Sequence, residues 1–288
     1  MDAELKPRHR TFETNGVRLH AVEAGPEGGP LLVLLHGFPE FWYGWRHQIE
    51  PLAAAGFHVL APDQRGYNLS DKPGKISDYN LDTLALDVVG LIDAMGEEKA
   101  HVVGHDWGGA VAWWLGVRHA GRLARLALLN IPHPGVMRRT LIKSSEQRKK
   151  SSYIFFFQLP GLPERLFRRN DFAYAAKSLQ ATSRPGTFTA ADLEVYREAW
   201  RQPGAVRSMI HWYRAALRSR PERPATSRVR VPTLLLWGRK DRFLGQEMAR
   251  PSIGLCDDGR LELCDDASHW LQHEEPERVN RRLIEFFT

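Results

Sequence analysis

Two features that are common in other protein classes are scarce in this sequence. Only two cysteines occur among the 288 residues, Cys256 and Cys264, and neither belongs to a Cys-x-x-Cys or Cys/His cluster. Two such cysteines build no disulfide framework and supply too few ligands for a zinc site, so we expect free thiols in a reducing cytoplasm and no metal. The longest apolar stretch, Ala110 to Val117, is far shorter than the roughly 18 residues that a membrane-spanning helix requires.

From the residues at the start of the chain and the spacing of its glycines, we expect neither an exported protein nor a nucleotide-binding one. Residues 1–6 include acids where an export leader has a positive start and then an apolar run. No Gly-x-Gly-x-x-Gly or Gly-x-x-x-x-Gly-Lys loop occurs, so the sequence offers no phosphate cradle for a nucleotide. We therefore expect a cytoplasmic protein with no membrane partner and no cofactor.

The basic residues are unevenly distributed along the chain. The whole chain has 40 Lys and Arg against 34 Asp and Glu; residues 134–224 have 18 against 7, and the remainder has 22 against 27. The densest basic stretch, Arg138 to Lys150, lacks the interleaved aromatic residues of a nucleic-acid platform. We interpret it as a solvated helix face, expect no nucleic-acid partner, and predict weak attraction between the two oppositely charged segments.

Short apolar runs alternate with helical patterns over most of the chain. The run at 31–35 is apolar on both faces, which is typical of a strand inside a parallel sheet. Similar runs occur at 58–61, 101–103, 126–129 and 233–237, and a weaker strand pattern lies at 17–24. Helical spacing lies between them at 81–92, and a last helix is predicted from Pro276. This alternation predicts an α/β fold with a mostly parallel sheet flanked by helices.

The strand signals stop in the middle of the chain. From residue 134 to residue 224 the patterns are aromatic and helical, interrupted by several prolines. We predict an all-helical insertion at 134–224 within a core formed by residues 1–133 and 225–288.

One turn of the predicted core has the spacing of a catalytic nucleophile. Gly104-His105-Asp106-Trp107-Gly108 follows an apolar strand and precedes a helix rich in small residues. Glycines on both sides of Asp106 permit a turn sharp enough to expose its side chain, as in a nucleophile elbow. The earlier segment His36 to Glu40 ends another strand, where this architecture places the second backbone donor of an oxyanion hole.

A carboxylate and a histidine follow in the order that such an elbow requires. Asp241 lies just past the strand at 233–237, and His269 lies shortly before the last helix. Nucleophile, acid and histidine in this order are typical of the α/β-hydrolase fold. We predict that Asp106, Asp241 and His269 form a catalytic triad.

With these motifs, the sequence resembles the α/β-hydrolase-fold epoxide hydrolases from Arg10 to Phe287. The resemblance rests on these motifs together with Asp63-Gln64-Arg65-Gly66-Tyr67 and Phe157-Gln158-Leu159-Pro160-Gly161. It implies that the insertion is a cap contributing two tyrosines, which match Tyr153 and Tyr213. The implied partners are a small apolar epoxide and water, without cofactor, for a monomer or homodimer.

The resemblance also implies roles for these residues. Asp106 would attack an epoxide carbon while Tyr153 and Tyr213 donate a proton to the ring oxygen, and His269 with Asp241 would activate water to hydrolyse the ester. The backbone N–H groups of Phe38 and Trp107 would form the oxyanion hole. The expected apolar wall consists of Phe38, Trp107, Phe155 and Phe156.

Three other interpretations share parts of this pattern. Haloalkane dehalogenases resemble the chain in fold and nucleophile, but halide release needs no proton, and a frequent Asn is replaced by Phe38. Some of these relatives carry their acid after the preceding strand, where this chain has Asn130. Fluoroacetate dehalogenases carry arginines beside the nucleophile, where this chain has Trp107 to Ala110. A binding protein built on an inactive hydrolase usually lacks the nucleophile or the histidine, and both are present here.

Overall fold

The computed structural model describes residues 6–219 and 224–288. Residues 1–5, which carry much of the expectation about an export leader, and residues 220–223, near the predicted end of the insertion, lie outside the described residues. Within the two described ranges, no helix is both long and apolar enough to cross a membrane. Cys256 and Cys264 are both free and buried.

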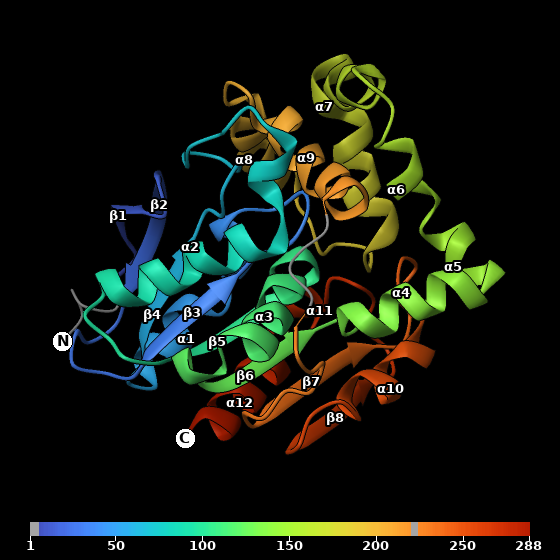
Figure 1. Ribbon diagram of the computed structural model, residues 1–288. Helices are drawn as coiled ribbons and strands as arrows, with labels where there is room; N and C mark the ends of the chain where they lie inside the picture. The colour runs from blue at the N-terminus through green and yellow to red at the C-terminus, as the bar shows by residue number, and fades with distance from the viewer. Residues whose placement is uncertain (1–5, 220–223) are drawn as a thin grey trace.

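One eight-stranded sheet forms the centre of the molecule (Figure 1). Its order is β1-β2-β4-β3-β5-β6-β7-β8; β2 pairs antiparallel with β1 and β4, and all other pairs are parallel. The predicted mostly parallel α/β sheet is therefore confirmed. The edge strands β1 and β8 were not predicted, because their half-exposed residues form no apolar run. The strands are β1 Arg8–Thr14, β2 Val17–Ala24, β3 Leu31–Leu35, β4 His58–Pro62, β5 Ala100–His105, β6 Leu123–Leu129, β7 Thr233–Gly238 and β8 Gly259–Cys264.

Helices cover both faces of the sheet because the strands in the middle of the sheet are apolar on both sides. On one face, α2 (Leu81–Ala94) and α3 (Asp106–Arg118) contribute to a large apolar cluster; on the other, α1 (Ile49–Ala54) and α12 (Pro276–Phe287) pack in a second cluster. The helix predicted from Pro276 is confirmed, with Val279, Leu283 and Phe286 buried. The remaining elements of the core are α10 Ala249–Ile253 and α11 Leu271–Glu274, with short 3-10 helices at Trp42–Trp45, Ile76–Tyr79, Ala120–Arg122 and Gln246–Met248.

Six helices fill the described part of the chain between β6 and β7, and no strand of the sheet lies among them. They lie above the sheet and to one side of it in Figure 1. The helix α7 is broken at 169–172, where three successive residues have positive φ. The exact boundaries 134 and 224 remain a prediction. These helices, called the cap below, are α4 Pro134–Lys143, α5 Ser145–Lys150, α6 Ser152–Phe156, α7 Leu162–Thr182, α8 Ala190–Arg201 and α9 Ala205–Arg218.

The opposite charges of cap and core make few contacts with each other. Among the described residues, two ion pairs cross the seam: Arg184 with Glu275 at 2.9 Å and Arg46 with Asp192 at 3.2 Å. The second pair joins a core cation to a cap anion, against the predicted direction. Attraction between a basic cap and an acidic core therefore rests on one partly exposed ion pair, which is worth little.

The order of the parallel strands brings four loops to one place. The strands β3, β5, β6 and β7 are neighbours in the sheet, so the loops that follow them meet at one edge. Ligands of open α/β sheets bind at this carboxyl edge of the strands. The site is therefore expected where His36, Asp106, Asn130 and Asp241 follow their strands.

The turn between β5 and α3 tests this packing. A Cβ at Gly104 would lie 2.5 Å from the Gly108 carbonyl oxygen and 2.6 Å from the Gly109 Cα. We expect Gly104→Ala to lower the free energy of unfolding by about 2–3 kcal/mol, because backbone on both sides of the contact must shift. In Gly121→Ala the added methyl meets no atom within 4 Å, so this matched variant should stay within about 0.5 kcal/mol of the wild type in urea unfolding. Equal losses in the two variants would contradict this account of the turn.

Candidate active site

Asp106 lies at the tip of a strained turn between β5 and α3. Its φ is +49°, a left-handed conformation that costs a residue with a Cβ of order 1–3 kcal/mol. Close approach of backbone permits the turn: a Cβ at Gly108 would lie 2.1 Å from the Leu35 carbonyl oxygen. The predicted elbow is thus present, with its carboxylate almost buried under the cap.

The loop after β3 packs directly against the Asp106 carboxylate. A Cβ at Gly37 would lie 2.4 Å from the Asp106 Cβ, so only glycine allows this contact. The Phe38 backbone N–H donates to Asp106 Oδ1 at 2.9 Å. One of the two expected backbone donors therefore points at the nucleophile position, while the Trp107 N–H makes no hydrogen bond to Asp106 among the described residues.

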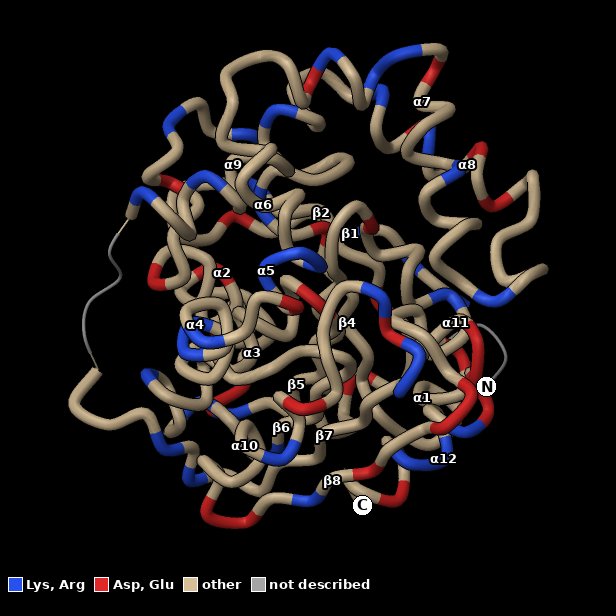
Figure 2. The backbone as a smooth tube through the Cα atoms, turned by 90° about the vertical axis from the view of Figure 1, so that its right-hand side faces the viewer, with Lys and Arg blue, Asp and Glu red and all other residues tan. Residues whose placement is uncertain are grey.

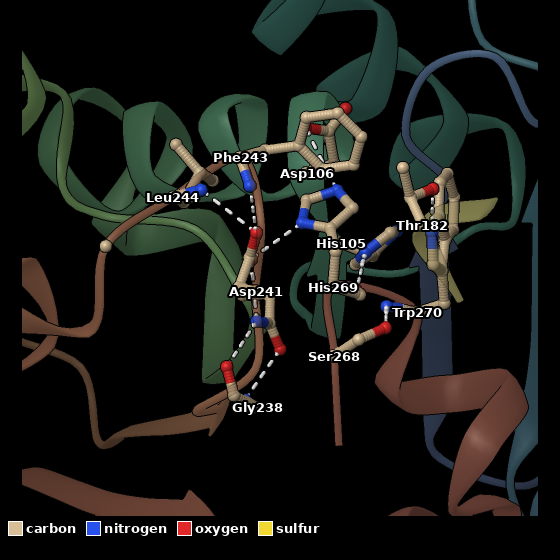
Figure 3. Close-up of polar contacts among 12 residues, drawn as sticks. His105, Asp106, Thr182, Gly238, Asp241, Phe243, Leu244, Ser268, His269 and Trp270 are labelled. Carbon is tan, nitrogen blue, oxygen red and sulfur yellow. Dashed lines mark hydrogen bonds and ion pairs between the residues drawn. The ribbon is translucent and has the colours of Figure 1, made fainter. Parts of the chain in front are cut away.

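His269 lies between the two carboxylates predicted to accompany it. Its Nδ1 is 2.8 Å from Asp241 Oδ2, and its Nε2 is 3.5 Å from Asp106 Oδ2. Figure 3 shows the imidazole between Asp241 and Asp106. The contact with Asp241 is a hydrogen bond, and the contact with Asp106 is an ion pair slightly longer than a hydrogen bond. Residues from three separate loops thus meet in one row.

Asp241 is fixed by donors on two elements. Its Oδ1 accepts from the backbone N–H groups of Phe243 at 2.7 Å and Leu244 at 2.9 Å. Its Oδ2 also accepts from the Asn130 side-chain amide at 2.8 Å, and Asn130 in turn accepts from the Gly238 N–H at 2.9 Å. Asn130 follows β6 with φ +46°, so it couples the end of one strand to the acid of the next.

Asn130 is a site residue that the sequence analysis passed over. In the sequence it is only the position where some haloalkane dehalogenases carry their acid. In the structure its side-chain amide holds Asp241 in place. The sequence feature that could have identified Asn130 is its location just past a buried strand, next to the strand that carries Asp241.

Electrostatics make Asp106 and His269 an ion pair. Burial alone would lower the pKa of His269, but the charges of Asp241 and Asp106 raise it to about 10. Burial would likewise raise the pKa of the Asp106 carboxyl, yet the hydrogen bond and charge of His269 bring it below its ordinary value. At neutral pH the imidazole is therefore protonated and the Asp106 carboxyl is ionised.

The two predicted cap tyrosines lie together above the elbow. Their ring centroids are 5.8 Å apart, and the Tyr213 ring is 5.0 Å from Trp107 and 5.1 Å from Phe38. Burial and the charge of Asp106 raise the pKa of the Tyr153 phenol, and burial with Tyr153 and Asp106 raises that of Tyr213. Both hydroxyls thus stay protonated and available as donors.

The expected apolar wall is partly wrong. Phe38 and Trp107 pack on Tyr213, but Phe155 is 53% exposed and makes no ring contact among the described residues. The physical reason is helical spacing: Phe155 lies two positions after Tyr153 and so points to the opposite side of α6. Phe156 packs at the edge of the apolar cluster, and its one ring contact among the described residues is with the neighbouring Phe157, at 5.9 Å.

Two phenylalanines missed in the sequence complete the wall. Phe157, four residues after Tyr153 and on its face of the chain, lies 4.8 Å from the Tyr213 ring and 5.5 Å from Phe38. Phe243 lies 5.1 Å from His269 and 5.9 Å from Tyr153. The i, i+4 spacing from Tyr153 could have predicted that Phe157 belongs to the wall, whereas the position of Phe243 follows only from the fold.

A buried ion pair positions the helix that carries Tyr213. The guanidinium of Arg214 contacts Glu164 at 2.6 Å and donates to the carbonyls of Phe157 and Leu159 at 3.0 and 2.6 Å. The Gln158 amide donates to the Tyr213 carbonyl at 3.0 Å. The turn after α6 is thereby tied to α9, which keeps Tyr153 and Tyr213 side by side.

Three aromatic donors of the cap bind the loops of the core. Trp200 Nε1 donates to the Pro39 carbonyl at 2.7 Å, and Trp212 Nε1 donates to the Arg65 carbonyl at 3.0 Å. The Tyr196 hydroxyl donates to Glu40 at 2.7 Å. These loops contain the two core motifs after β3 and β4, so the cap is anchored where the site is built.

Glu40 is the centre of a second buried charged group. Its carboxylate accepts from Tyr196, from His273 Nε2 at 2.7 Å and from Gln272 at 3.1 Å. Burial would raise the pKa of Glu40, but His273 and His105 hold it well below its ordinary value. His105 in turn contacts the His269 carbonyl at 2.8 Å, so this group supports the backbone of the histidine.

The fold and this geometry define an α/β hydrolase whose nucleophile position holds a carboxylate. The Asp106 carboxylate, the protonated imidazole of His269 and the phenols of Tyr153 and Tyr213 lie among packed aromatic rings, an arrangement suited to opening a bond and then hydrolysing an ester. Within the described ranges, no group of three or more His, Cys, Asp or Glu is arranged to hold a metal ion.

Comparisons with known proteins agree with this class. Residues 30–276 match the family model described as alpha/beta hydrolase fold. The chain is 50% identical to the Bacillus subtilis AB hydrolase superfamily protein YfhM over 95% of both chains, and 38% identical to human Epoxide hydrolase 4, covering 96% of this chain and 77% of that one. Among solved structures, a mutant epoxide hydrolase from Bacillus megaterium matches with a TM-score of 0.88 and 30% identity over 96% of this chain and 99% of that one. The chain belongs to the epoxide hydrolase family of the α/β hydrolases.

The charge state of His269 leads to a prediction about stability. Its folded pKa of about 10 lies above the ordinary value near 6.5, so the stabilisation is complete below pH 6.5 and is lost as pH rises toward 10. Relative to His269→Gln, the wild type should therefore lose about 1.4 kcal/mol of unfolding free energy per pH unit between pH 7.5 and 9.5.

A matched histidine variant provides the control for this titration. Burial lowers the pKa of His101 to about 4, so His101 is neutral throughout this window in both folded and unfolded chains. The difference between wild type and His101→Gln should stay flat in denaturant unfolding at the same pH values. A flat profile for His269→Gln as well would contradict the ion pair.

Proposed function

We propose that the protein hydrolyses epoxides to vicinal diols through a covalent ester on Asp106. The observation that carries this proposal is the pair of protonated cap hydroxyls, Tyr153 and Tyr213, above a carboxylate that is paired with His269. Relatives named epoxide hydrolase in human, mouse and bacteria support it. We infer a small apolar substrate from the aromatic residues that surround the carboxylate.

The first step opens the ring. A carboxylate oxygen of Asp106 attacks one epoxide carbon, and the bond from that carbon to the ring oxygen breaks. The departing oxygen takes a proton from Tyr153 or Tyr213, whose raised pKa keeps the proton available until negative charge develops. The product of this step is an ester on Asp106 that carries a free β-hydroxyl group.

Formation of the ester changes the charge that His269 experiences. The Asp106 carboxylate becomes neutral, so one of the two anions that raise the pKa of the imidazole is removed. His269 can then release its proton to the phenolate left by the first step. The resting imidazolium is thereby converted into a base only after the ester has formed.

The second step returns the enzyme to its resting state. Neutral His269, oriented by Asp241, takes a proton from water, and the resulting hydroxide attacks the ester carbonyl carbon of Asp106. The Phe38 N–H, already 2.9 Å from the carboxylate, stabilises the oxyanion, together with the Trp107 N–H. The diol leaves with the remaining proton of the attacking water, Asp106 is again ionised, and no cofactor is consumed.

Dehalogenation explains fewer of the contacts. A departing halide takes no proton, so two buried phenols with raised pKa values would have no task in it. The segment after Asp106, Trp107 to Ala110, offers no arginine for a substrate carboxylate.

Oxygen-18 labelling of a single turnover tests the covalent step. With excess enzyme, styrene oxide and oxygen-18 water, the label is expected in the Asp106 peptide and not in the diol, because water attacks the ester carbonyl. Mass spectrometry of the peptide and the diol measures both. Label in the diol with an unlabelled peptide would refute the ester mechanism, and His269→Gln, which retains the first step, should accumulate the ester mass on Asp106.

Removal of the phenol protons tests the cap tyrosines. In Tyr153→Phe/Tyr213→Phe we expect the rate of ring opening to fall by at least about 100-fold, since general acid catalysis typically contributes 10²–10⁴. Stopped-flow measurement of diol or ester formation gives this rate. Tyr174→Phe removes the hydroxyl of an exposed cap residue and should leave the rate unchanged. Turnover of a haloalkane by the double variant, with no turnover of epoxides by the wild type, would favour a dehalogenase.

A further inference from the structure

A basic hollow opens on the outer side of the cap, beside the start of α7. Its cavity volume is about 1030 Å³, and it lies between the first turns of α7 and the first turn of α9. Figure 2 shows basic segments along α7. The hollow is lined by four arginines, one glutamate, one leucine and two glycines: Arg165, Arg168, Arg169, Arg207, Glu164, Leu166, Gly161 and Gly204.

The four arginines of this hollow carry uncompensated charge. All four are exposed, and within the described ranges their side chains form no ion pair or hydrogen bond. The one acid in the lining, Glu164, is already bound by Arg214 at 2.6 Å. Elsewhere in the cap, Arg197 and Arg201 are paired with Glu194 at 3.1 and 2.7 Å. The hollow therefore contains part of the positive charge of residues 134–224 that forms no ion pair with the core.

Exposed leucines lie next to these arginines. Leu162 is 43% exposed and Leu166 is 38% exposed, one turn apart on α7, and Leu159 in the preceding turn is 44% exposed. The opposite side of the same turns buries Pro163 and Phe167 in the cap. Leucine and arginine on one exposed helix face are typical of segments that lie at a membrane surface.

We propose that this face of the cap docks on an anionic phospholipid surface. The phosphate groups of the lipids would occupy the hollow, because guanidinium groups bind phosphate oxygens in a bidentate manner. The three leucines would enter the boundary between headgroups and acyl chains. A soluble phosphate compound would satisfy the arginines but would leave the leucines in water, so the lipid is the occupant that accounts for both.

Co-sedimentation of the full chain with vesicles tests the docking. We expect strong binding to vesicles of equal parts phosphatidylglycerol and phosphatidylcholine, and little binding to phosphatidylcholine alone. Binding should weaken as salt rises from about 0.05 to 0.5 M, because the attraction is screened. Equal binding to both vesicle types, or no binding to either, would overturn the proposal.

Two cap variants with the same change in charge locate the surface. Arg165→Gln/Arg168→Gln/Arg169→Gln should reduce partitioning onto anionic vesicles by about 10- to 100-fold. Arg138→Gln/Lys143→Gln/Lys149→Gln removes three charges from α4 and α5 and should change it by no more than about threefold. Equal losses in the two variants would show that total charge, and not the hollow, governs binding.

A binding experiment with soluble phosphate compounds distinguishes a lipid ligand from free phosphate. Leu162→Ser/Leu166→Ser should weaken vesicle binding while its affinity for inorganic phosphate and glycerol phosphate, measured by calorimetry, stays that of the wild type. Glycerol phosphate binding in the micromolar range with no vesicle binding would overturn the lipid assignment. The residues changed in the two triple variants and in the leucine variant lie outside the proposed catalytic group. Epoxide turnover in solution should therefore be unchanged in all three variants, and this measurement also verifies that the variants fold.

Discussion

The structure depends on burying two carboxylates and one imidazole together under the cap. A single buried charge is costly, so each of these groups requires its neighbours. Asp106 and Asp241 lie on opposite sides of His269, and their charges raise the pKa of the imidazole and so stabilise the imidazolium between them. The surplus negative charge is met by hydrogen bonds from the backbone, two of them to Asp241 and one to Asp106.

The cap contributes to this arrangement in two ways. It supplies the phenols and part of the apolar wall, and it also holds the loops beneath it through the donors of Tyr196, Trp200 and Trp212. The segment His36–Glu40 is held from both sides, by the cap at Pro39 and Glu40 and by the elbow at Gly37 and Phe38. The Phe38 N–H is thus positioned by contacts that come from the insertion as well as from the core.

The sequence predicted the parts of the site that follow from chain order. The strands near the middle of the sheet are apolar runs, and Asp106 and Asp241 come directly after two of them, so their meeting at one edge of the sheet was predictable. The edge strands β1 and β8 escaped because half-exposed strands have no continuous apolar run. The positions of Asn130, Phe157 and Phe243 depend on packing between distant segments, which the order of residues does not show. The prediction for Phe155 was wrong because this residue lies on the exposed side of the short helix α6.

The hydrogen bonds between cap aromatics and core loops have a consequence for engineering. A cap taken from a relative fits this core only if it supplies donors for the Pro39 and Arg65 carbonyls and for the Glu40 carboxylate. The unit of exchange between such enzymes is therefore the cap together with residues 36–40 and 63–67 of the core. Exchange of this whole unit keeps the Asp106 carboxylate and its Phe38 N–H donor in the same relative position while the shape of the pocket changes.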